Sequence, residues 1–449
     1  MHKIAAVTPT RSLAPLPIPS LENFVAGVQA WLAPFLSDTA QTELAHGLAA
    51  HRGELETAQA QLMAHADQAN KAGKSWLEDW WLNSYLSVQP RTTNFGFILN
   101  IKPPEPQHDI SPQDAQRAYI TERLESLITA IKDGMLPDSP ADHQLRETSF
   151  SRRGISQDGT PTVHRDFSYA IHLAETDLTP QQLMDPLPDE HLNGLTVVID
   201  PQGQVGINFE HSRIDGQTAL KIAKWIIKDQ LDIRPMPTPA NEPYHLLTLL
   251  LPTVPRPHQI SRDTLCQLAI NHTVYQHNPR QPFSTYESVS LMDTFEHGRT
   301  EGHISTTAES LLFNKTTDKA DLLEAAKANR IRVSDCQKGQ GMLRHLFGLR
   351  KLLPPDSDAQ KFLRSHLFDA LDQHLVSTSN CSDKDQLIRA FAFPPTHPHG
   401  VGIGYYTSDT QVTFCISANP ADRDSRRLKA HLIKTLPTTF ETFQALLSS

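Results

Sequence analysis

Cysteine is scarce in this chain, and its few copies stand far apart. The 449 residues include only Cys266, Cys336, Cys381 and Cys415, and none belongs to a Cys-x-x-Cys pair. This distribution argues against a zinc ribbon and a disulfide scaffold, and it fits a reducing compartment. The 22 histidines mostly stand singly, without metal-ligand spacing. We therefore expect no metal ion and no cofactor.

Long apolar runs and clusters of positive charge are also missing. No run approaches the roughly 18 apolar residues of a membrane span, and the first twenty residues lack the apolar core of a signal peptide. The net charge of −9 is spread along the chain, which disfavours nucleic acid because phosphate binding requires a clustered basic face. We expect no integral membrane association and a cytoplasmic address, with a cleaved organelle presequence as the alternative.

The composition that remains is that of a folded protein, with 39% hydrophobic and 20% charged residues. The prolines of residues 12–19 exclude a helix there, because proline lacks the amide donor, so this segment should lie extended. Residues 136–165 are polar and irregular and are predicted to form an exposed connection. Periodicity and capping residues predict helices at 20–36, 38–70, 75–87, 111–134, 216–230, 261–274, 318–330, 340–352, 357–375 and 422–447.

Strand signals are interleaved with these helices without a strict βαβ rhythm. The clearest is a hairpin of residues 195–200 and 204–210 around Pro201-Gln202-Gly203. Further strands are predicted at 167–173, 285–292, 400–407 and 411–417. The mixture indicates an α/β (α+β) fold with layers around more than one sheet.

The segment His211-x-x-x-Asp215-Gly216 follows the second hairpin strand and precedes a helix. Histidine suits general-base catalysis because its unperturbed pKa lies near physiological pH. Asp215 could brace the turn through a basic partner such as Arg213, and Gly216 would let the chain turn without a Cβ clash. The alternative interpretation is a core histidine followed by a helix-capping aspartate.

The same pattern marks the superfamily of chloramphenicol acetyltransferase, condensation domains and plant acyltransferases. Several further blocks, in order along the chain, resemble the carnitine/choline acyltransferase family. They are Leu16-Pro17-Ile18-Pro19-Ser20-Leu21, Trp76-Leu77-x-x-Trp80-Trp81-x-x-x-Tyr85-Leu86, Asn208-Phe209-Glu210-His211-Ser212, Tyr286-Glu287-Ser288-Val289-Ser290, Gly298-Arg299-Thr300, Arg344-His345-Leu346-Phe347-Gly348-Leu349 and Ser377-Thr378-Ser379.

This resemblance implies two domains of chloramphenicol-acetyltransferase-like build with an active-site tunnel between them. One domain would be discontinuous, made of residues 1–74 and 240–449. The other, residues 75–239, would carry the histidine motif. The resemblance also implies that the chain is shortened between the Trp-Trp block and that motif.

The family's catalytic roles carry over to residues present in this chain. His211 would deprotonate an acceptor hydroxyl that attacks an acyl-CoA thioester, with Glu210, Asp215 and Gly216 supporting the site. Ser379 would donate to the developing oxyanion, a role worth a few kcal/mol. The alternative for the Ser-Thr-Ser segment is a capped turn after the helix at 357–375.

The resemblance also implies an acceptor-binding set made of Tyr286, Thr300, Arg344, Ser377 and Phe391. The guanidinium, the threonine and the tyrosine would hold the carboxylate of carnitine, for which arginine is well suited. The aromatic ring would lie near the trimethylammonium group, because a cation over an aromatic face is stabilised. The alternative for the arginine is a surface ion pair.

The residues expected near the acyl-CoA donor depart from the family pattern. Of the basic pair that reaches the CoA phosphates only Arg256 remains, Leu343 replaces an aspartate, and Arg389 brings charge near the acyl pocket. Two alternatives therefore stay open beside a carnitine-type O-acyltransferase. One is a divergent biosynthetic acyltransferase fed by an acyl carrier protein, and the other is a catalytically silent binding homologue.

Overall fold

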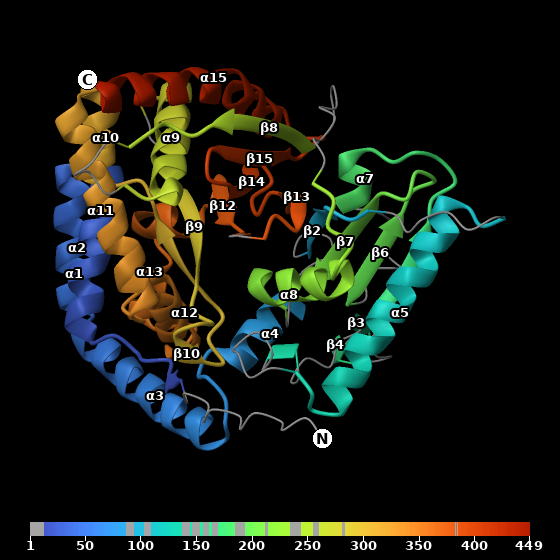
Figure 1. Cartoon of the computed structure of the whole chain (residues 1–449). Helices are drawn as coiled ribbons and strands as arrows, with labels where there is room; N and C mark the ends of the chain where they lie inside the picture. The colour runs from blue at the N-terminus through green and yellow to red at the C-terminus, as the bar shows by residue number, and fades with distance from the viewer. Residues whose placement is uncertain are drawn as a thin grey trace, which may run out of the picture.

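The computed structural model describes residues 13–86, 94–102, 109–136, 144–145, 153–155, 161–163, 169–184, 194–211, 214–233, 244–254, 260–280, 283–381, 383 and 385–449. Two large sheets with helices packed on them make up this part of the chain (Figure 1). The predicted α/β (α+β) class with more than one sheet is therefore confirmed. No helix in the described ranges has the length and apolarity needed to cross a membrane.

The larger sheet has six strands in the order β11-β9-β12-β14-β15-β8. Its central strand β12 runs parallel to both neighbours, β9 and β14, whereas the other pairs are antiparallel. The strands are β8 (Tyr244–Leu250), β9 (Thr285–Ser290), β11 (Thr300–Ile304), β12 (Val376–Asn380), β14 (Val401–Thr407) and β15 (Gln411–Ala418).

Helices pack on this sheet and form two apolar cores with its strands. One core joins β12, β14 and β15 to α9 (Arg262–His277), α11 (Lys319–Gln337) and α15 (Arg423–Ser448). The other core surrounds Trp76, Trp81 and Leu346 and gathers the N-terminal helices (Figure 1). Its helices are α1 (Leu21–Leu32), α2 (Asp38–Ala50), α3 (Arg52–Lys71), α4 (Glu78–Leu86), α12 (Leu343–Leu352) and α13 (Asp358–Leu363).

The smaller sheet has five strands in the order β13-β2-β7-β6-β5. Helices α5 (Pro112–Lys132) and α8 (Gly216–Ile227) pack on it in one core, and the short α7 (Pro180–Met184) contacts β2 and β7 in another. Its strands are β2 (Asn94–Leu99), β5 (Tyr169–Leu173), β6 (Leu195–Ile199), β7 (Val205–Glu210) and β13 (Ile388–Ala392).

The smaller elements connect or extend these layers. The proline-rich start lies extended as predicted, since β1 pairs in parallel with β10. The remaining elements are β1 (Ala14–Pro15), η1 (Ala33–Phe35), β3 (Arg153–Ile155), β4 (Pro161–Val163), β10 (Phe295–Glu296), α10 (Ala308–Thr316), η4 (His366–Phe368) and α14 (Asp369–Asp372).

Serine caps begin several helices at or next to the predicted starts. The side chains of Ser20, Ser111 and Ser261 each accept a hydrogen bond from the backbone N–H three residues later. Such a bond satisfies one of the four amide donors that a helix leaves open at its start, which fixes where the helix begins. The predicted helix at 38–70 divides at His51, and the one at 357–375 breaks into three short turns.

Two segments cross the predicted domain line, whose boundaries stay a prediction. β13, from the segment 240–449, pairs with β2 of the smaller sheet. Trp76, Leu77 and Trp81, from the segment 75–239, pack in the core of the N-terminal helices. The C-terminal half therefore contributes a strand to the smaller sheet, and the second predicted domain contributes side chains to the core of the N-terminal helices. The predicted connection at 136–165 lies mostly outside the described residues.

Candidate active site

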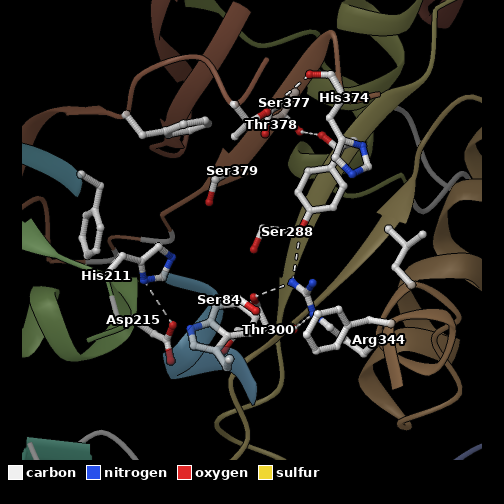
Figure 2. A pocket seen from close by; sticks show the side chains of 18 of the residues that line it. Ser84, His211, Asp215, Ser288, Thr300, Arg344, His374, Ser377, Thr378 and Ser379 are labelled. Carbon is white, nitrogen blue, oxygen red and sulfur yellow. Dashed lines mark hydrogen bonds and ion pairs between the residues drawn. The ribbon is translucent and has the colours of Figure 1, made fainter. Parts of the chain in front are cut away.

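A cavity of about 770 Å³ opens between the two sheets. Such a volume is typical of small-molecule sites. Residues of both sheets and of α4, α8 and α12 line it, as Figure 2 shows. The predicted site residues that line it are His211, Asp215, Gly216, Tyr286, Thr300, Arg344, Ser377, Ser379 and Phe391.

His211 directly follows β7, and its ring points into the cavity (Figure 2). Its Nδ1 lies 2.6 Å from the carbonyl oxygen of Ile214 and 3.6 Å from Oδ1 of Asp215. A carbonyl oxygen can only accept, so Nδ1 carries the proton and donates to it. The neutral ring then keeps an unprotonated Nε2, which is the atom a general base requires.

The electrostatic surroundings of His211 favour this neutral form. Burial lowers the pKa of the imidazole, Asp215 raises it, and Arg299 lowers it. Phe95 and Trp81 supply apolar surroundings by contacting the ring edge-on, with ring centroids 5.0 Å and 6.2 Å away. The imidazole is therefore neutral at neutral pH, with the proton on Nδ1, and it can accept a proton at Nε2.

Asp215 stands at the N-cap position of α8, but its side chain makes no capping hydrogen bond. Its Oδ2 pairs with Nε of Arg299 at 2.9 Å and accepts a hydrogen bond from Gln144 at 2.8 Å. Both ion-pair partners are buried, and Arg299 also donates to the backbone oxygen of His211 at 2.9 Å. The aspartate thus braces the histidine turn, and its basic partner here is Arg299, whereas Arg213 lies outside the described residues.

Strands β9 and β12 bring hydroxyl groups to the centre of the cavity. Ser379 is directly opposite Ser288 in the parallel pairing of these strands, and both side chains project toward the space in front of His211 (Figure 2). Ser377 lies two residues earlier on β12, and side chains alternate along a strand, which places it on the same face. The Ser-Thr-Ser segment is thus a sheet strand and not a capped turn.

Arg344 is the second residue of α12, on the opposite side of the cavity. Its Nε donates to the backbone oxygen of Thr300 at 2.8 Å, and its Nη2 lies 3.4 Å from Thr300 Oγ1 and 3.5 Å from the hydroxyl of Tyr286. The three predicted carboxylate-binding side chains therefore converge, and Figure 2 shows Arg344 beside Thr300. The two longer contacts are weak hydrogen bonds.

Two further titratable side chains, Glu301 and His374, lie beside these residues. Oε1 of Glu301 accepts hydrogen bonds from the backbone N–H groups of Gly302 and Arg344. Burial raises the pKa of Glu301 to about 7, although the positive charge of Arg344 lowers it. His374 packs against Tyr286 with ring centroids 4.5 Å apart, and burial lowers its pKa to about 4, assisted by Arg344.

A second buried network holds the back of β12. Asp263 accepts hydrogen bonds from Asn380 at 2.8 Å and from the hydroxyl of Tyr405 at 2.6 Å. Thr378, between the two serines, donates to the backbone oxygen of Tyr286 and accepts from Gln267, both at 2.8 Å. These bonds fix the register of the serines against the acceptor-side tyrosine.

The other predicted site residues have different outcomes. Glu210 is buried at the end of β7 and does not line the cavity, and its predicted supporting role stays a prediction. Arg256 lies outside the described residues. A Cβ on Gly216 would meet only Cys381 Sγ at 3.6 Å, an ordinary contact, so the predicted clash is not found. Phe391 contacts Phe95, with ring centroids 6.2 Å apart, and so lies on the His211 side.

Five residues at the site had no role predicted from the sequence: Arg299, Trp81, Ser288, His374 and Gln144. The first three stand inside the family blocks, and alternation along residues 286–290 would have placed Ser288 on the same face as Tyr286. Gln144 and His374 carried no sequence signal. Among the described residues, no group of three or more His, Cys, Asp or Glu side chains could hold a metal ion.

Relatives of known name match this chain at low identity. Carnitine O-acetyltransferase, mitochondrial, of Saccharomyces cerevisiae is 23% identical over 374 residues, which cover 69% of this chain and 55% of that protein. Carnitine O-acetyltransferase of Columba livia is 32% identical over 197 residues, covering 40% of this chain and 30% of that one. The chain spans about half the length of curated relatives it matches.

Solved structures resemble it more distantly. The wax ester synthase/diacylglycerol acyltransferase from Marinobacter aquaeolei VT8 aligns over 82% of this chain and 97% of that one, with 12% identity and a TM-score of 0.43. This likeness is too remote to support an argument about either substrate or mechanism.

The family model of choline/carnitine O-acyltransferases matches residues 16–158 and 253–434. These ranges include Trp81, Tyr286, Thr300, Arg344 and Ser379 but not the segment that contains His211. The match covers well over half of the sequence, and its blocks converge on one cavity in the structure. The chain therefore belongs to the choline/carnitine O-acyltransferase family.

Proposed function

We propose that this protein transfers an acyl group from a thioester to the hydroxyl of a small acceptor that carries a carboxylate, with carnitine as the first candidate. The observation that carries the proposal is the placement of His211 and Arg344 in one cavity with two strand serines between them. Family membership and the named relatives support the same chemistry.

In the proposed reaction, His211 Nε2 takes the proton of the acceptor hydroxyl while its oxygen attacks the thioester carbonyl carbon. The carbonyl oxygen becomes an oxyanion, toward which Ser379 Oγ donates. The C–S bond then breaks, the acyl ester is released, and the thiolate leaves with the proton from the imidazolium. The reaction is balanced without a cofactor, so the donor thioester is a substrate.

Arg344, Thr300 and Tyr286 are proposed to bind the acceptor carboxylate. An arginine presents several N–H donors in one plane, which matches the two oxygens of a carboxylate. Ser377 and Phe391 are proposed to complete the acceptor site, and Arg256 to contact CoA. A cytoplasmic address is proposed as well, although the yeast relative is named as mitochondrial.

The experiment that tests this proposal compares acceptors in the wild type and in Arg344→Asn, with acetyl-CoA as the donor. We expect the substitution to raise the KM for carnitine strongly and to change kcat less, because the carboxylate is bound alike in the ground and transition states. It should also narrow the preference for carnitine over choline, which has no carboxylate. A wild type that prefers choline would contradict the proposed acceptor.

His211→Ala supplies the second arm of this test. Turnover should fall by orders of magnitude while the fold is retained, as judged by circular dichroism. In the wild type, burial lowers the pKa of His211, so the acid limb of the pH profile of kcat/KM should lie below pH 6.5. Replacing acetyl-CoA by an acetylated carrier protein in the same assay identifies the donor class.

A further inference from the structure

One indole lies beneath two arginines that belong to different parts of the site. Trp81 is on α4, is buried and lines the cavity. The guanidinium carbon of Arg344 lies 4.6 Å from its ring centroid, and that of Arg299 lies 5.1 Å away. Both distances are within the roughly 6 Å at which a cation is attracted to an aromatic face.

The two arginines position different groups in the proposed reaction: one the general base and the other the acceptor. Arg299 pairs with Asp215 and donates to the backbone oxygen of His211, so it positions the base. Arg344 faces Thr300 and Tyr286, so it positions the acceptor. Trp81 is therefore the side chain that the base and the acceptor site share, and its ring also contacts the His211 ring, with the two centroids 6.2 Å apart.

The contact with Trp81 restrains Arg344 without using its donors. Guanidinium N–H groups point outward in the plane of the group, whereas its face is weakly hydrated and stacks on aromatic rings. Nε of Arg344 donates to the backbone oxygen of Thr300 at 2.8 Å, whereas its Nη2 contacts with Thr300 Oγ1 and the Tyr286 hydroxyl are long, at 3.4 Å and 3.5 Å. The ring face therefore adds a restraint on the guanidinium that still lets its Nη groups donate to a carboxylate.

We infer that Trp81 is a positioning residue that fixes Arg344 for the acceptor carboxylate and Arg299 for the His211–Asp215 pair through its ring face. This inference rests on the proposed function, because it assigns the arginines their roles in acyl transfer. It predicts that one substitution disturbs acceptor binding and the proton affinity of the base, each through a different arginine.

The first arm measures carnitine binding by titration calorimetry, which does not depend on turnover. Trp81→Leu should raise the Kd about tenfold, a typical effect of a buried cation–π contact, and Trp81→Phe should raise it less. In an Arg344→Gln background, Trp81→Leu should add less than a twofold change, because the interaction is already lost. An undiminished tenfold effect in that background overturns the acceptor half of the inference.

Binding of 3-hydroxybutanoate, which shares the carboxylate and hydroxyl of carnitine but lacks the ammonium group, separates positioning from direct contact. If Trp81 acts through Arg344, Trp81→Leu weakens both ligands by the same factor. A loss confined to carnitine would show that the indole contacts the trimethylammonium group itself, and would overturn the inference. Trp80→Phe is the matched control, since Trp80 stacks on His65 and does not line the cavity.

The second arm follows the pH dependence of His211 modification by diethyl pyrocarbonate, read for its own peptide by mass spectrometry. Arg299 lowers the pKa of His211, so loosening it in Trp81→Leu should move the midpoint upward by about half a pH unit, a threefold change in proton affinity. The shift should be smaller in an Arg299→Gln background, where only the loss of apolar contact with the imidazole remains. An unmoved midpoint, or one that moves equally in both backgrounds, overturns the base half.

If the proposed function is wrong, the binding and modification experiments give results that differ from those expected for a wrong role of Trp81. A wild type that binds neither carnitine nor 3-hydroxybutanoate contradicts the proposed acceptor. The modification arm needs no acceptor, so it still confirms or overturns the link from Trp81 to His211.

Discussion

At the scale of single residues, the basicity of His211 depends on a balance between burial and one aspartate. Burial lowers its pKa, whereas Asp215 raises it and Arg299 partly cancels that effect. The hydrogen bond from Nδ1 to the oxygen of Ile214 settles the tautomer. The aspartate that capping rules would assign to the start of α8 is used instead by the buried arginine.

Asp215→Asn should therefore destabilise the protein strongly. Both charged groups of the pair are buried, and removal of one partner leaves the other charge uncompensated, which costs about 3–5 kcal/mol. Urea unfolding of the variant and the wild type gives this difference. Asp409→Asn is the control, because the exposed Arg262–Asp409 pair should contribute at most about 1 kcal/mol. Equal, small losses in both variants would contradict a buried ion pair at the active site.

Ser379→Ala should lower kcat on the order of a hundredfold, the usual loss of one oxyanion donor, with little change in the KM for the acceptor. Ser288→Ala is the matched control, because Ser288 lies directly opposite on β9 and also lines the cavity. Steady-state kinetics of the two variants decide which hydroxyl is the donor. A larger kcat loss in Ser288→Ala would transfer the role to Ser288.

At the scale of elements, a buried acid cluster stabilises the strands that carry the serines. Asp263 on α9 and Glu287 on β9 hydrogen-bond through their carboxyl groups, and burial raises their pKa values to about 8 and about 7. His303 lies 2.6 Å from Glu287, but burial lowers its pKa to about 3. His303 is therefore neutral, and its contact with Glu287 is a hydrogen bond rather than an ion pair.

This cluster should make the stability of the protein fall as the pH rises. The folded state retains a proton on Asp263 between about pH 4 and pH 8 that the unfolded chain releases, so stability decreases through that window, by at most about 1.4 kcal/mol per pH unit. Asp263→Asn imitates the protonated acid and should flatten the decline between pH 6 and pH 8. Denaturant unfolding at several pH values measures this, with exposed Asp356→Asn as the control. Parallel curves for the Asp263 variant and the wild type would refute a shared proton.

At the scale of the whole molecule, the two halves are tied together by β13 and by contacts between the sheets. Ile98 of β2 and Leu246 of β8 belong to one buried cluster, so the sheets share a core. The cavity lies between the halves, and its geometry therefore depends on their joint stability.

The halves should consequently unfold in one cooperative transition. Phe97→Ala removes a fully buried ring of the smaller sheet, packed on Phe391 of β13, and should cost about 3–5 kcal/mol. Four of the five tryptophans, Trp31, Trp76, Trp80 and Trp81, lie in or against the core of the N-terminal helices, and of these only Trp81 also contacts His211 at the end of the smaller sheet's β7. Their fluorescence transition should shift with the substitution, and an unmoved transition would indicate independent domains.

Short buried strands were the part of the fold that patterns missed. β2, β11 and β13 are buried at every position, so they show no alternation of apolar and polar residues. The hairpin of β6 and β7 was predictable because its turn residues mark it. Amphipathic helices with serine caps were predictable for a similar local reason.

The sequence by itself determined the family, the position of His211 between a strand and a helix, and nine of the residues that line the cavity. The position of His211 follows from local turn and capping signals. The family and the cavity residues follow from the sequence motifs that occur in the family's order along the chain. Only the tertiary structure decided that Arg299 pairs with Asp215, that Nδ1 of His211 is occupied, that Trp81 contacts two arginines, and that β13 joins the other sheet. Each of these depends on how segments distant in sequence pack together, and no local periodicity encodes that packing.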